Sequence, residues 1–379
     1  MEKRIKFDIL IPQDILAIKE VFIANGFKLF VVGGAVRDAL LNETPKDFDL
    51  ATDAEPDIVE EIMNISGFST LPTGKAFGVI NVFTDMGEYE IATFRLDLGS
   101  GRRPDGVVFT NIEGDVKRRD LTINALFYDI DTREVVDLVG GIEDLKNGVI
   151  RTVGVAEDRF NEDKLRILRA IRFAARFGSD LEPSVHAALN KDSSLEGISG
   201  ERIRDEFLKG LKSAKSTVSF LSMIDKYGLF DWVFKGFTIN KNFIEESDSN
   251  LLIAILLKPN NIDIVSKHLI TLKYTAHEVK DIVFLLNLLN LSIPTAVSIK
   301  KLQKHTRITS DQIKKFANLE KIDKNLIESF LKFELSVTGE EVMDKLKIKS
   351  GPELGKTIQM IETENFENLL NSTYLFYKK

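Results

Sequence analysis

The sequence predicts an α+β fold, in which a mixed-sheet head at the N-terminus is followed by helices alone. Over residues 1–150, short apolar runs alternate with turn residues, which is typical of strands. Adjacent strands joined by short turns favour an antiparallel or mixed sheet over repeated βαβ units. After Glu157, apolar residues recur at helical spacing almost to the end of the chain. We therefore expect a head over residues 1–150, a helical neck over 151–215, and a helical body and tail over 216–379.

The elements of the head follow from local patterns. A first strand is expected to end in two glycines that open a helix, and two further strand pairs surround turn residues. In chain order we expect a strand at Leu29–Val32, a helix at Ala35–Leu41, strands at Val79–Phe83 and Tyr89–Phe94 around a turn at residues 85–87, and strands at Asn124–Ile130 and Glu134–Val139 around a turn near Asp131.

Composition excludes several classes of protein. The chain has 379 residues, 44% hydrophobic and 29% charged, as in globular domains. No apolar run approaches the roughly 20 residues that span a bilayer, and no apolar stretch follows the N-terminal charges as in a signal peptide. The absence of cysteine excludes disulfides, thiolate zinc sites and cysteine nucleophiles. We expect a cytoplasmic protein without membrane contact. Its net charge of −7 restricts any nucleic-acid contact to local basic patches.

Two aspartates, Asp47 and Asp49, flank Phe48 shortly after the first strand. In an extended segment they share one face, while Phe48 points to the core on the other. Paired carboxylates repel each other, and a hard cation such as Mg²⁺ is the usual compensation. Mg²⁺ beside a glycine-rich turn suggests chemistry on phosphates. The alternative is an ordinary polar turn, in which aspartate is common.

Two further features of the head are compatible with a phosphate site. Backbone N–H groups at Gly33 and Gly34 can approach an anion closely, and Arg37 follows one helical turn later. A Gly-Gly before a helix is also common turn geometry. Glu90 lies on the face of its strand shared with Ala92, an unusual place for a carboxylate unless a cation is near. The alternative for Glu90 is an exposed position on an edge strand.

Basic residues concentrate in two more places. Arg118 and Arg119 precede the strand expected from Asn124. They could bind a triphosphate or an RNA backbone. The alternative is a solvated loop in which they form surface ion pairs. A helix is predicted through residues 161–173. Asp163, Arg166, Arg169 and Arg172 follow one another at intervals of three along it. Stacked like charges disfavour a helix, so an anionic partner explains the arginines better than an Asp163–Arg166 ion pair alone.

Taken in order, these motifs resemble a known family. Gly-Gly-Ala-Val-Arg-Asp, Asp-Phe-Asp-Leu-Ala-Thr, Arg-Arg-Asp-Leu-Thr-Ile-Asn-Ala-Leu and Glu-Asp-x-x-Arg-x-x-Arg look like the class II tRNA nucleotidyltransferases, which comprise the CCA-adding enzymes and the bacterial poly(A) polymerases. The resemblance covers roughly residues 29 to 210. It implies a polymerase-β-like nucleotidyltransferase head, a neck that selects the nucleotide, and a body and tail that bind tRNA.

The resemblance also implies roles for individual residues. Asp47 and Asp49 would hold Mg²⁺, and Glu90 would be the third catalytic carboxylate, near the 3′-hydroxyl of the primer. The remaining family positions would bind the nucleotide: Gly33, Gly34, Arg37 and Arg119 at the triphosphate or sugar, Asp163 and Arg166 at the base, and Arg169 and Arg172 at phosphates or the wall of the site. Residues 201–207 resemble a helical motif that stabilises head and neck.

Hydrogen-bonding chemistry explains how Asp163 and Arg166 would choose a base. A carboxylate only accepts hydrogen bonds and a guanidinium only donates them. Cytosine and adenine both present an exocyclic amine beside a ring nitrogen acceptor, whereas guanine and uracil present a carbonyl and an N–H. The pair would therefore admit C and A and reject G and U without a template.

The expected function is template-independent addition of CCA to the 3′ end of tRNA from CTP and ATP, with release of pyrophosphate. The partners would be the acceptor stem and elbow of tRNA and the two nucleotides, without an obligate protein partner. Alternatives are a partial enzyme that adds only CC or only A, a poly(A) polymerase, and a catalytically inactive RNA-binding protein. The segment Arg95–Pro104 matches the family's flexible loop, and because residues 102–105 are retained we favour full CCA addition. A set of basic residues is a candidate tRNA patch or a solvated surface: Lys300, Lys301, Lys304, Arg307, Lys314 and Lys315.

Overall fold

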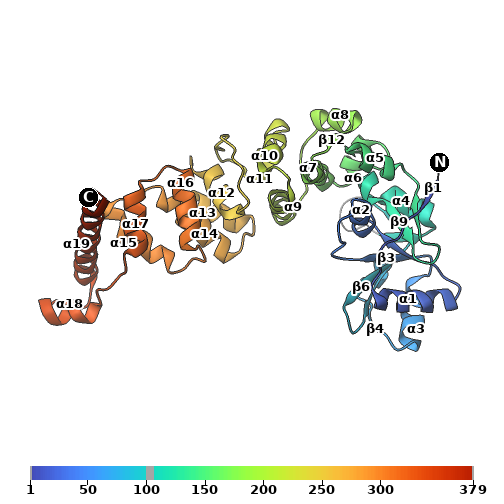
Figure 1. The fold of residues 1–379 in the computed structure, drawn as a ribbon, viewed down its shortest axis with the longest axis horizontal. Helices are drawn as coiled ribbons and strands as arrows, with labels where there is room; N and C mark the ends of the chain where they lie inside the picture. The colour runs from blue at the N-terminus through green and yellow to red at the C-terminus, as the bar shows by residue number, and fades with distance from the viewer. Residues whose placement is uncertain (1, 100–105, 378–379) are drawn as a thin grey trace. The chain divides into compact units, whose positions relative to one another are not determined.

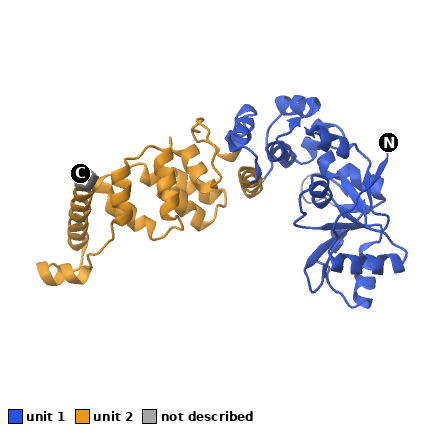
Figure 2. Cartoon of the chain, viewed as in Figure 1, with its two compact units in different colours: residues 1–198, 213–232 blue, residues 199–212, 233–379 orange. Residues whose placement is uncertain are grey.

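The computed structural model describes residues 2–99 and 106–377 and divides into two compact units. Unit 1 comprises residues 1–198 and 213–232, and unit 2 comprises residues 199–212 and 233–379 (Figure 2). In the described chain, the strands all belong to unit 1, and unit 2 is built from helices (Figure 1). The predicted class, a mixed sheet followed by helices, is confirmed.

Unit 1 is built on a sheet of eight strands. In spatial order they are β1 (Lys3–Lys6), β10 (Glu134–Asp137), β9 (Leu126–Asp129), β2 (Leu29–Val32), β3 (Asp49–Thr52), β6 (Glu88–Thr93), β5 (Val79–Phe83) and β4 (Ser69–Leu71). Among these, β3 and β6 run parallel and the other neighbours antiparallel. The two predicted strand pairs, β5–β6 and β9–β10, are therefore confirmed.

Two small sheets accompany the large one. β7 (Arg95–Leu98) pairs antiparallel with β8 (Gly106–Phe109), and β11 (Val149–Ile150) pairs parallel with β12 (Asp180–Leu181). The loop residues 102–105, on which the expectation of full CCA addition depended, lie outside the described residues.

The two faces of the large sheet bury separate cores. On one face, Val31, Leu50 and Ile91 pack with Phe22 and Met63 from the covering helices. On the other face, Phe30, Phe94 and Phe127 meet at ring-centroid distances of 5.6 to 6.4 Å. Because side chains alternate along a strand, each residue of β3 and β6 belongs to one face or the other. The aromatic face is the one that carries the candidate site.

Helices and short 3₁₀ turns complete unit 1. They are α1 (Gln13–Ala24), α2 (Gly34–Leu40), α3 (Pro56–Ile65), η1 (Lys75–Phe77), α4 (Ile112–Arg118), η2 (Thr122–Asn124), α5 (Gly141–Asn147), α6 (Ala156–Glu162), α7 (Leu165–Phe177), α8 (Pro183–Lys191) and α10 (Thr217–Lys226). The strand expected from Asn124 begins only at Leu126, because the backbone of Asn124 closes the η2 turn onto Leu121.

Unit 2 is an assembly of helices with well-defined ends. They are α9 (Gly200–Ser213), α12 (Ser249–Leu257), α13 (Ile262–Thr271), α14 (Ala276–Leu288), α15 (Ile293–Gln303), α16 (Ser310–Leu319), α17 (Lys324–Lys332), α18 (Gly339–Leu346) and α19 (Pro352–Tyr377). The short α11 (Phe230–Val233) ends at the unit boundary. Thr275 and Glu278 form a capping box that starts α14, and such caps satisfy the free N–H groups of a first turn. Within the described residues, no helix combines the length and apolarity that a membrane span requires.

Candidate active site

The glycine turn after β2 brings three predicted site residues together. Gly33 has φ of +68°, a backbone conformation that favours glycine. A Cβ atom on Gly33 would lie 3.7 Å from the Nη1 atom of Arg119 and 3.5 Å from the backbone oxygen of Asn124. Val32, just before the turn, pairs with Asp49 in the sheet. The glycine turn, the strand that carries Asp49, and Arg119 are therefore neighbours in space.

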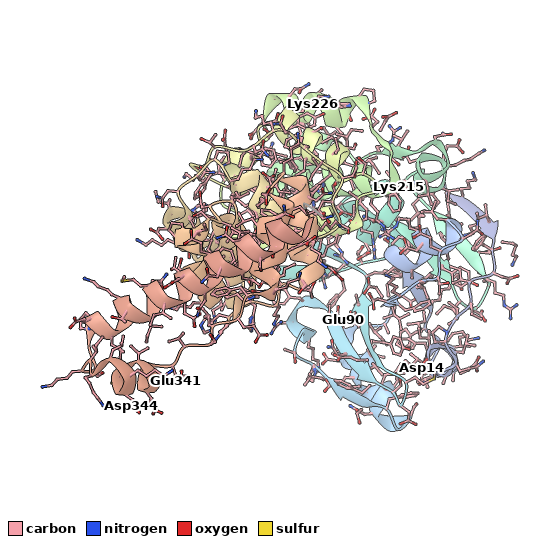
Figure 3. The ribbon with its side chains drawn as sticks, turned by 60° about the vertical axis from the view of Figure 1, so that its left-hand side comes forward. Asp14, Glu90, Lys215, Lys226, Glu341 and Asp344 are labelled. Carbon is pink, nitrogen blue, oxygen red and sulfur yellow. The ribbon has the colours of Figure 1, made fainter. Side chains whose placement is uncertain are left out.

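Asp47, Asp49 and Glu90 lie at one edge of the parallel strand pair. Leu50 pairs with Ile91, so Asp49 and Glu90 are the preceding positions on strands that run side by side, roughly 5 Å apart. Both face the aromatic side of the sheet. Glu90 is exposed on β6, opposite Asn81, and Figure 3 labels it on that strand.

The electrostatics of the two aspartates fit a cation. Partial burial raises the pKa of Asp49, the charge of Arg119 lowers it, and the charge of Asp47 raises it again, with a net rise. The raised pKa of Asp49 and its neighbouring carboxylate at Asp47 match a hard divalent cation, which takes carboxylate oxygens as ligands. Within residues 2–99 and 106–377, no three acidic or histidine side chains are arranged to hold a metal together. Glu90 therefore shares the face of the aspartates without completing a three-ligand site.

Arg119 is held beside the aspartates by a buried acid. Its Nη2 atom lies 2.9 Å from an oxygen of Asp115, and its guanidinium carbon lies 4.6 Å from the centre of the Phe127 ring. Burial raises the pKa of Asp115, but Arg119 and Arg118 lower it more, so the carboxylate remains charged. The ion pair fixes the direction of Arg119 toward the glycine turn.

Arg37, which is predicted to bind the nucleotide, lies in the interior of the protein. Its side chain is buried, with a residue exposure of 4%, and does not extend over an open surface. It is paired with Asp38, at 2.7 Å, and donates a hydrogen bond to the side-chain oxygen of Asn124. Its guanidinium carbon also lies 5.1 Å from the ring centre of Phe173 on α7. In this structure Arg37 joins α2 to α7.

The predicted continuous helix from residue 161 to 173 is wrong, because it breaks at Asp163. α6 ends at Glu162, Asp163 has an extended backbone, and α7 begins at Leu165. The carboxylate of Asp163 accepts the backbone N–H of Leu165, which caps the new helix. Arg166 contacts Glu162 at 2.6 Å and lies close enough to Asp163 to interact with its charge.

Arg166, Arg169 and Arg172 line up along a half-buried side of α7. Arg166 donates to the backbone oxygen of Arg118, at 3.1 Å. Arg169 donates to Asp120, at 2.6 Å, and Arg172 lies 4.2 Å from the ring centre of Phe173. Guanidinium groups that stack on aromatic rings keep their charge oriented. The predicted base-selecting and phosphate-binding residues of the neck therefore reach the head through Arg118 and Asp120.

Sequence reasoning missed Asp120, Asn124 and Phe173. Asp120 is nearly buried, and although burial raises its pKa, Arg169 and further hydrogen bonds give a net lowering. The signal was available: Asp120 and Asn124 follow Arg119 within one short run, and Phe173 lies four residues after Arg169 on the same helix. Nothing in the sequence shows that Asn124 contacts Asp120 and Arg37, or that Phe173 lies between Arg37 and Arg169.

Comparison with known proteins identifies related families. Residues 29–151 match the model of the Poly A polymerase head domain, and residues 180–240 match the model described as a probable RNA and SrmB-binding site of polymerase A. The CCA-adding enzyme of Lactobacillus johnsonii is 33% identical over 370 residues, which is 92% of this chain and 91% of the relative. The CCA-adding enzyme of Staphylococcus aureus is 32% identical over 367 residues, 89% of each chain.

Solved structures share the fold. The Bacillus stearothermophilus CCA-adding enzyme in complex with CTP superposes with a TM-score of 0.68 at 23% identity, covering 97% of this chain and all of that one. The Thermotoga maritima CCA-adding enzyme complexed with tRNA-CCA superposes with a TM-score of 0.65 at 21% identity. The match covers 97% of this chain and 96% of that one. At this identity the likeness shows a common fold, and the family is shown by the curated relatives. The chain belongs to the family of CCA-adding enzymes.

Proposed function

We propose that this protein adds CCA to the 3′ end of tRNA, using CTP and ATP and releasing pyrophosphate. The observation that carries the proposal is the 33% identity to a curated CCA-adding enzyme along 92% of the chain. A relationship of this extent includes both the head and the helical part. The grouping of Gly33, Asp49 and Arg119 at one sheet edge supports the same conclusion from geometry.

Mg²⁺ is the proposed cofactor, held by Asp47 and Asp49. When bound, it would lower the barrier by stabilising charge on the attacking and leaving oxygens of the displacement. The raised pKa of Asp49, caused by burial and by Asp47, supports a site that requires a cation. Glu90, on the next strand, faces the same side and would lie near the 3′-hydroxyl of the tRNA.

The reaction is an in-line displacement. The 3′-oxygen of the tRNA forms a bond to the α-phosphorus while the bond from that phosphorus to the pyrophosphate oxygen breaks. The proton of the 3′-hydroxyl leaves to a carboxylate or to water. Without side chains, Gly33 and Gly34 would let the triphosphate approach the backbone closely, and Arg119 would contribute a fixed positive charge beside them. Arg37 would support this turn from inside the protein.

We propose that Asp163 and Arg166 select the base. Arg169 and Arg172 would bind phosphates or form the wall of the nucleotide site. Asp163 is fixed at the break before α7, and Arg166 is held by Glu162 and by the oxygen of Arg118. A donor and an acceptor fixed in this way can match cytosine and adenine, and they leave buried groups unpaired against guanine and uracil. Such mismatches allow rejection by about 10⁴-fold.

The function is tested by offering the purified protein three tRNAs, which end before CCA, after C, and after CC. Each is incubated with labelled CTP, ATP, or both. Full CCA addition to the first tRNA is the expected result. Growth that stops after CC, or growth only from CC, identifies a partial enzyme, and a long A tail identifies a poly(A) polymerase. No extension of any tRNA, with binding intact, would contradict the proposal. We expect the enzyme to act in the cytoplasm, with its tRNA and nucleotides as partners.

A further inference from the structure

Two parts of the proposed site are connected by a chain of buried polar contacts. One part is the glycine turn with Arg37, which belongs to the triphosphate side. The other is α7 with Arg169, which belongs to the nucleotide-selecting side. Asn124 and Asp120 lie between them, and neither was expected to contact substrate. We call these four residues, together with Phe173, the Asn124 bridge.

Each contact of the Asn124 bridge is defined. The side-chain oxygen of Asn124 accepts a hydrogen bond from Arg37, and its side-chain nitrogen donates to Asp120 at 3.3 Å. The other oxygen of Asp120 accepts from Nε of Arg169 at 2.6 Å. The chain closes through Phe173, whose ring centre lies 5.1 Å from the guanidinium of Arg37 and 5.8 Å from that of Arg169.

The chemistry at position 124 requires an amide. A guanidinium only donates and a carboxylate only accepts, so the residue between Arg37 and Asp120 must accept on one side and donate on the other. Asparagine does this with one short side chain, and at 9% exposure it has little access to water that could replace either contact. The backbone oxygen of Asn124 also packs against Gly33, at the phosphate turn.

A buried polar chain of this kind is sensitive to small changes. Within the protein a fully satisfied network rigidifies its members, and a broken one leaves charges and dipoles unpaired. Loss of the amide at Asn124 would release Asp120 from Arg37, and Asp120 orients Arg169 on the helix that carries Arg166. The triphosphate side and the base-reading side would then lose one of the contacts that fix their spacing, while Arg37 still stacks on Phe173.

We propose that Asn124 is a positioning residue for nucleotide choice, which couples the phosphate turn to the base-selecting helix α7. The inference rests on the proposed function, because it assigns α7 to base selection. It predicts that loss of the amide reduces discrimination between correct and incorrect nucleotides more than it reduces the maximal rate with CTP.

The test uses the full-length protein and the variant Asn124→Asp, which places a second acceptor against Asp120. Initial rates with CTP, ATP, GTP and UTP are measured on tRNA lacking CCA, and kcat and KM are separated for each. We expect the ratio of kcat/KM for CTP over UTP to fall by about tenfold or more, the scale of one lost contact within a coupled network. If Asn124→Asp does not fold, Asn124→Ala, which removes both contacts of the side chain, replaces it with the same expected fall in the ratio.

Thr122→Val is the matched control. Thr122 lies in the same η2 turn, is 1% exposed, and donates a hydrogen bond to Asp144 at 2.7 Å, outside the Asn124 bridge. It should lower the melting temperature as Asn124→Asp does and leave the CTP to UTP ratio unchanged. An unchanged ratio in the Asn124 variant, or an equal fall in both variants, would overturn the inference. Failure of the unaltered protein to extend tRNA would instead contradict the proposed function.

Discussion

Asp49 carries its negative charge at a cost, because partial burial and the charge of Asp47 both raise its pKa. Asp49→Asn removes that charge and one proposed metal ligand. We expect nucleotide incorporation to fall by more than about a hundredfold, since even outer-shell partners of a metal are worth 10- to 100-fold. tRNA binding should persist, and the metal-free variant should melt slightly higher. Thermal unfolding, filter binding and primer extension measure the three effects.

Asp53→Asn is a suitable control for Asp49. Asp53 follows the same strand, is exposed, and accepts the backbone N–H of Lys28 at 2.9 Å. Its amide variant keeps an oxygen acceptor and should retain incorporation within about twofold, as expected of surface substitutions. Equal activity of the Asp49 variant and the Asp53 variant would remove Asp49 from the site.

The same pKa shift predicts how pH affects metal binding. A carboxylate with a raised pKa keeps its proton to a higher pH than the ordinary value of about 3.9, and a protonated carboxyl does not bind Mg²⁺. In the metal-free protein, the stability cost of ionising Asp49 is absent below the ordinary pKa, develops as pH rises from there to the raised pKa, and is complete above it. The Mg²⁺ concentration for half-maximal rate should therefore rise as pH falls. Rates measured against Mg²⁺ concentration at several pH values and fixed ionic strength test this rise, and a requirement that does not change with pH would contradict it.

Asp163 should affect the choice of nucleotide more than the chemistry. Asp163→Ala removes the proposed acceptor for the base amine and leaves Asp47 and Asp49 intact. We expect discrimination against GTP and UTP to fall by about 10²-fold or more, in line with the loss of a buried polar match. The variant also loses the cap of α7, worth about 1 kcal/mol, so assays belong well below its melting temperature. Unchanged selectivity among the four nucleotides would contradict the assignment.

Elements with strong local patterns were predictable from the sequence, and their connections were not. The strands β2, β5 and β6 follow from apolar runs and turn residues, and they appear within a residue or two of the expected bounds. The break at Asp163 was missed because arginines at helical spacing continue through it. From the sequence alone, an aspartate that caps a helix cannot be distinguished from an aspartate inside a helix.

Individual side chains were harder to predict than the elements that carry them. Arg37 looked like a phosphate ligand in the sequence, and its burial against Phe173 depends on a helix more than a hundred residues later. The pairing of Asp120 with Arg169 also joins residues 49 positions apart in sequence. Long-range contacts of this kind are set by the packing of the whole unit, which local spacing does not encode.

The long helix α19 fixes the chain that precedes α18 through one buried acid. Glu362 is 1% exposed, and its Oε1 atom accepts the backbone N–H groups of Ser336 and Val337 at 2.7 and 2.6 Å. Glu362→Ala should lower the free energy of unfolding of this part by roughly 1–3 kcal/mol, because two backbone donors lose their acceptor. Glu362→Gln keeps an oxygen acceptor and should lower the free energy of unfolding by less. Glu364 is exposed on α19, and Glu364→Ala should change the free energy of unfolding by no more than about 0.5 kcal/mol. Urea unfolding of the three variants provides the comparison, and equal losses at Glu362 and Glu364 would contradict the role.

At the scale of the whole molecule, an acidic chain must bind an acidic polymer through restricted surfaces. The net charge is −7, so general attraction to RNA is absent. Of the six basic residues considered for tRNA contact, three make side-chain contacts within unit 2. The Nζ atom of Lys300 donates to the backbone oxygen of Phe330 at 3.1 Å, Lys301 donates to the side-chain oxygen of Gln359 at 3.3 Å, and Lys315 pairs with Glu246 at 2.8 Å. Lys304, Arg307 and Lys314 are exposed and form the remaining candidate surface.

Salt dependence separates these two groups of basic residues. Each phosphate contact by a lysine adds about 0.7 to 0.9 to the slope of log K against log salt, because it releases a bound counterion. Lys304→Gln and Lys314→Gln should therefore weaken tRNA binding and reduce the slope by about this amount each. Lys356→Gln, an equal loss of charge at an exposed position on α19, should leave the slope unchanged. Lys300→Gln should lower stability through its lost contacts with Phe330, without altering the slope. Identical slopes for all four variants would show that tRNA is held elsewhere on the protein.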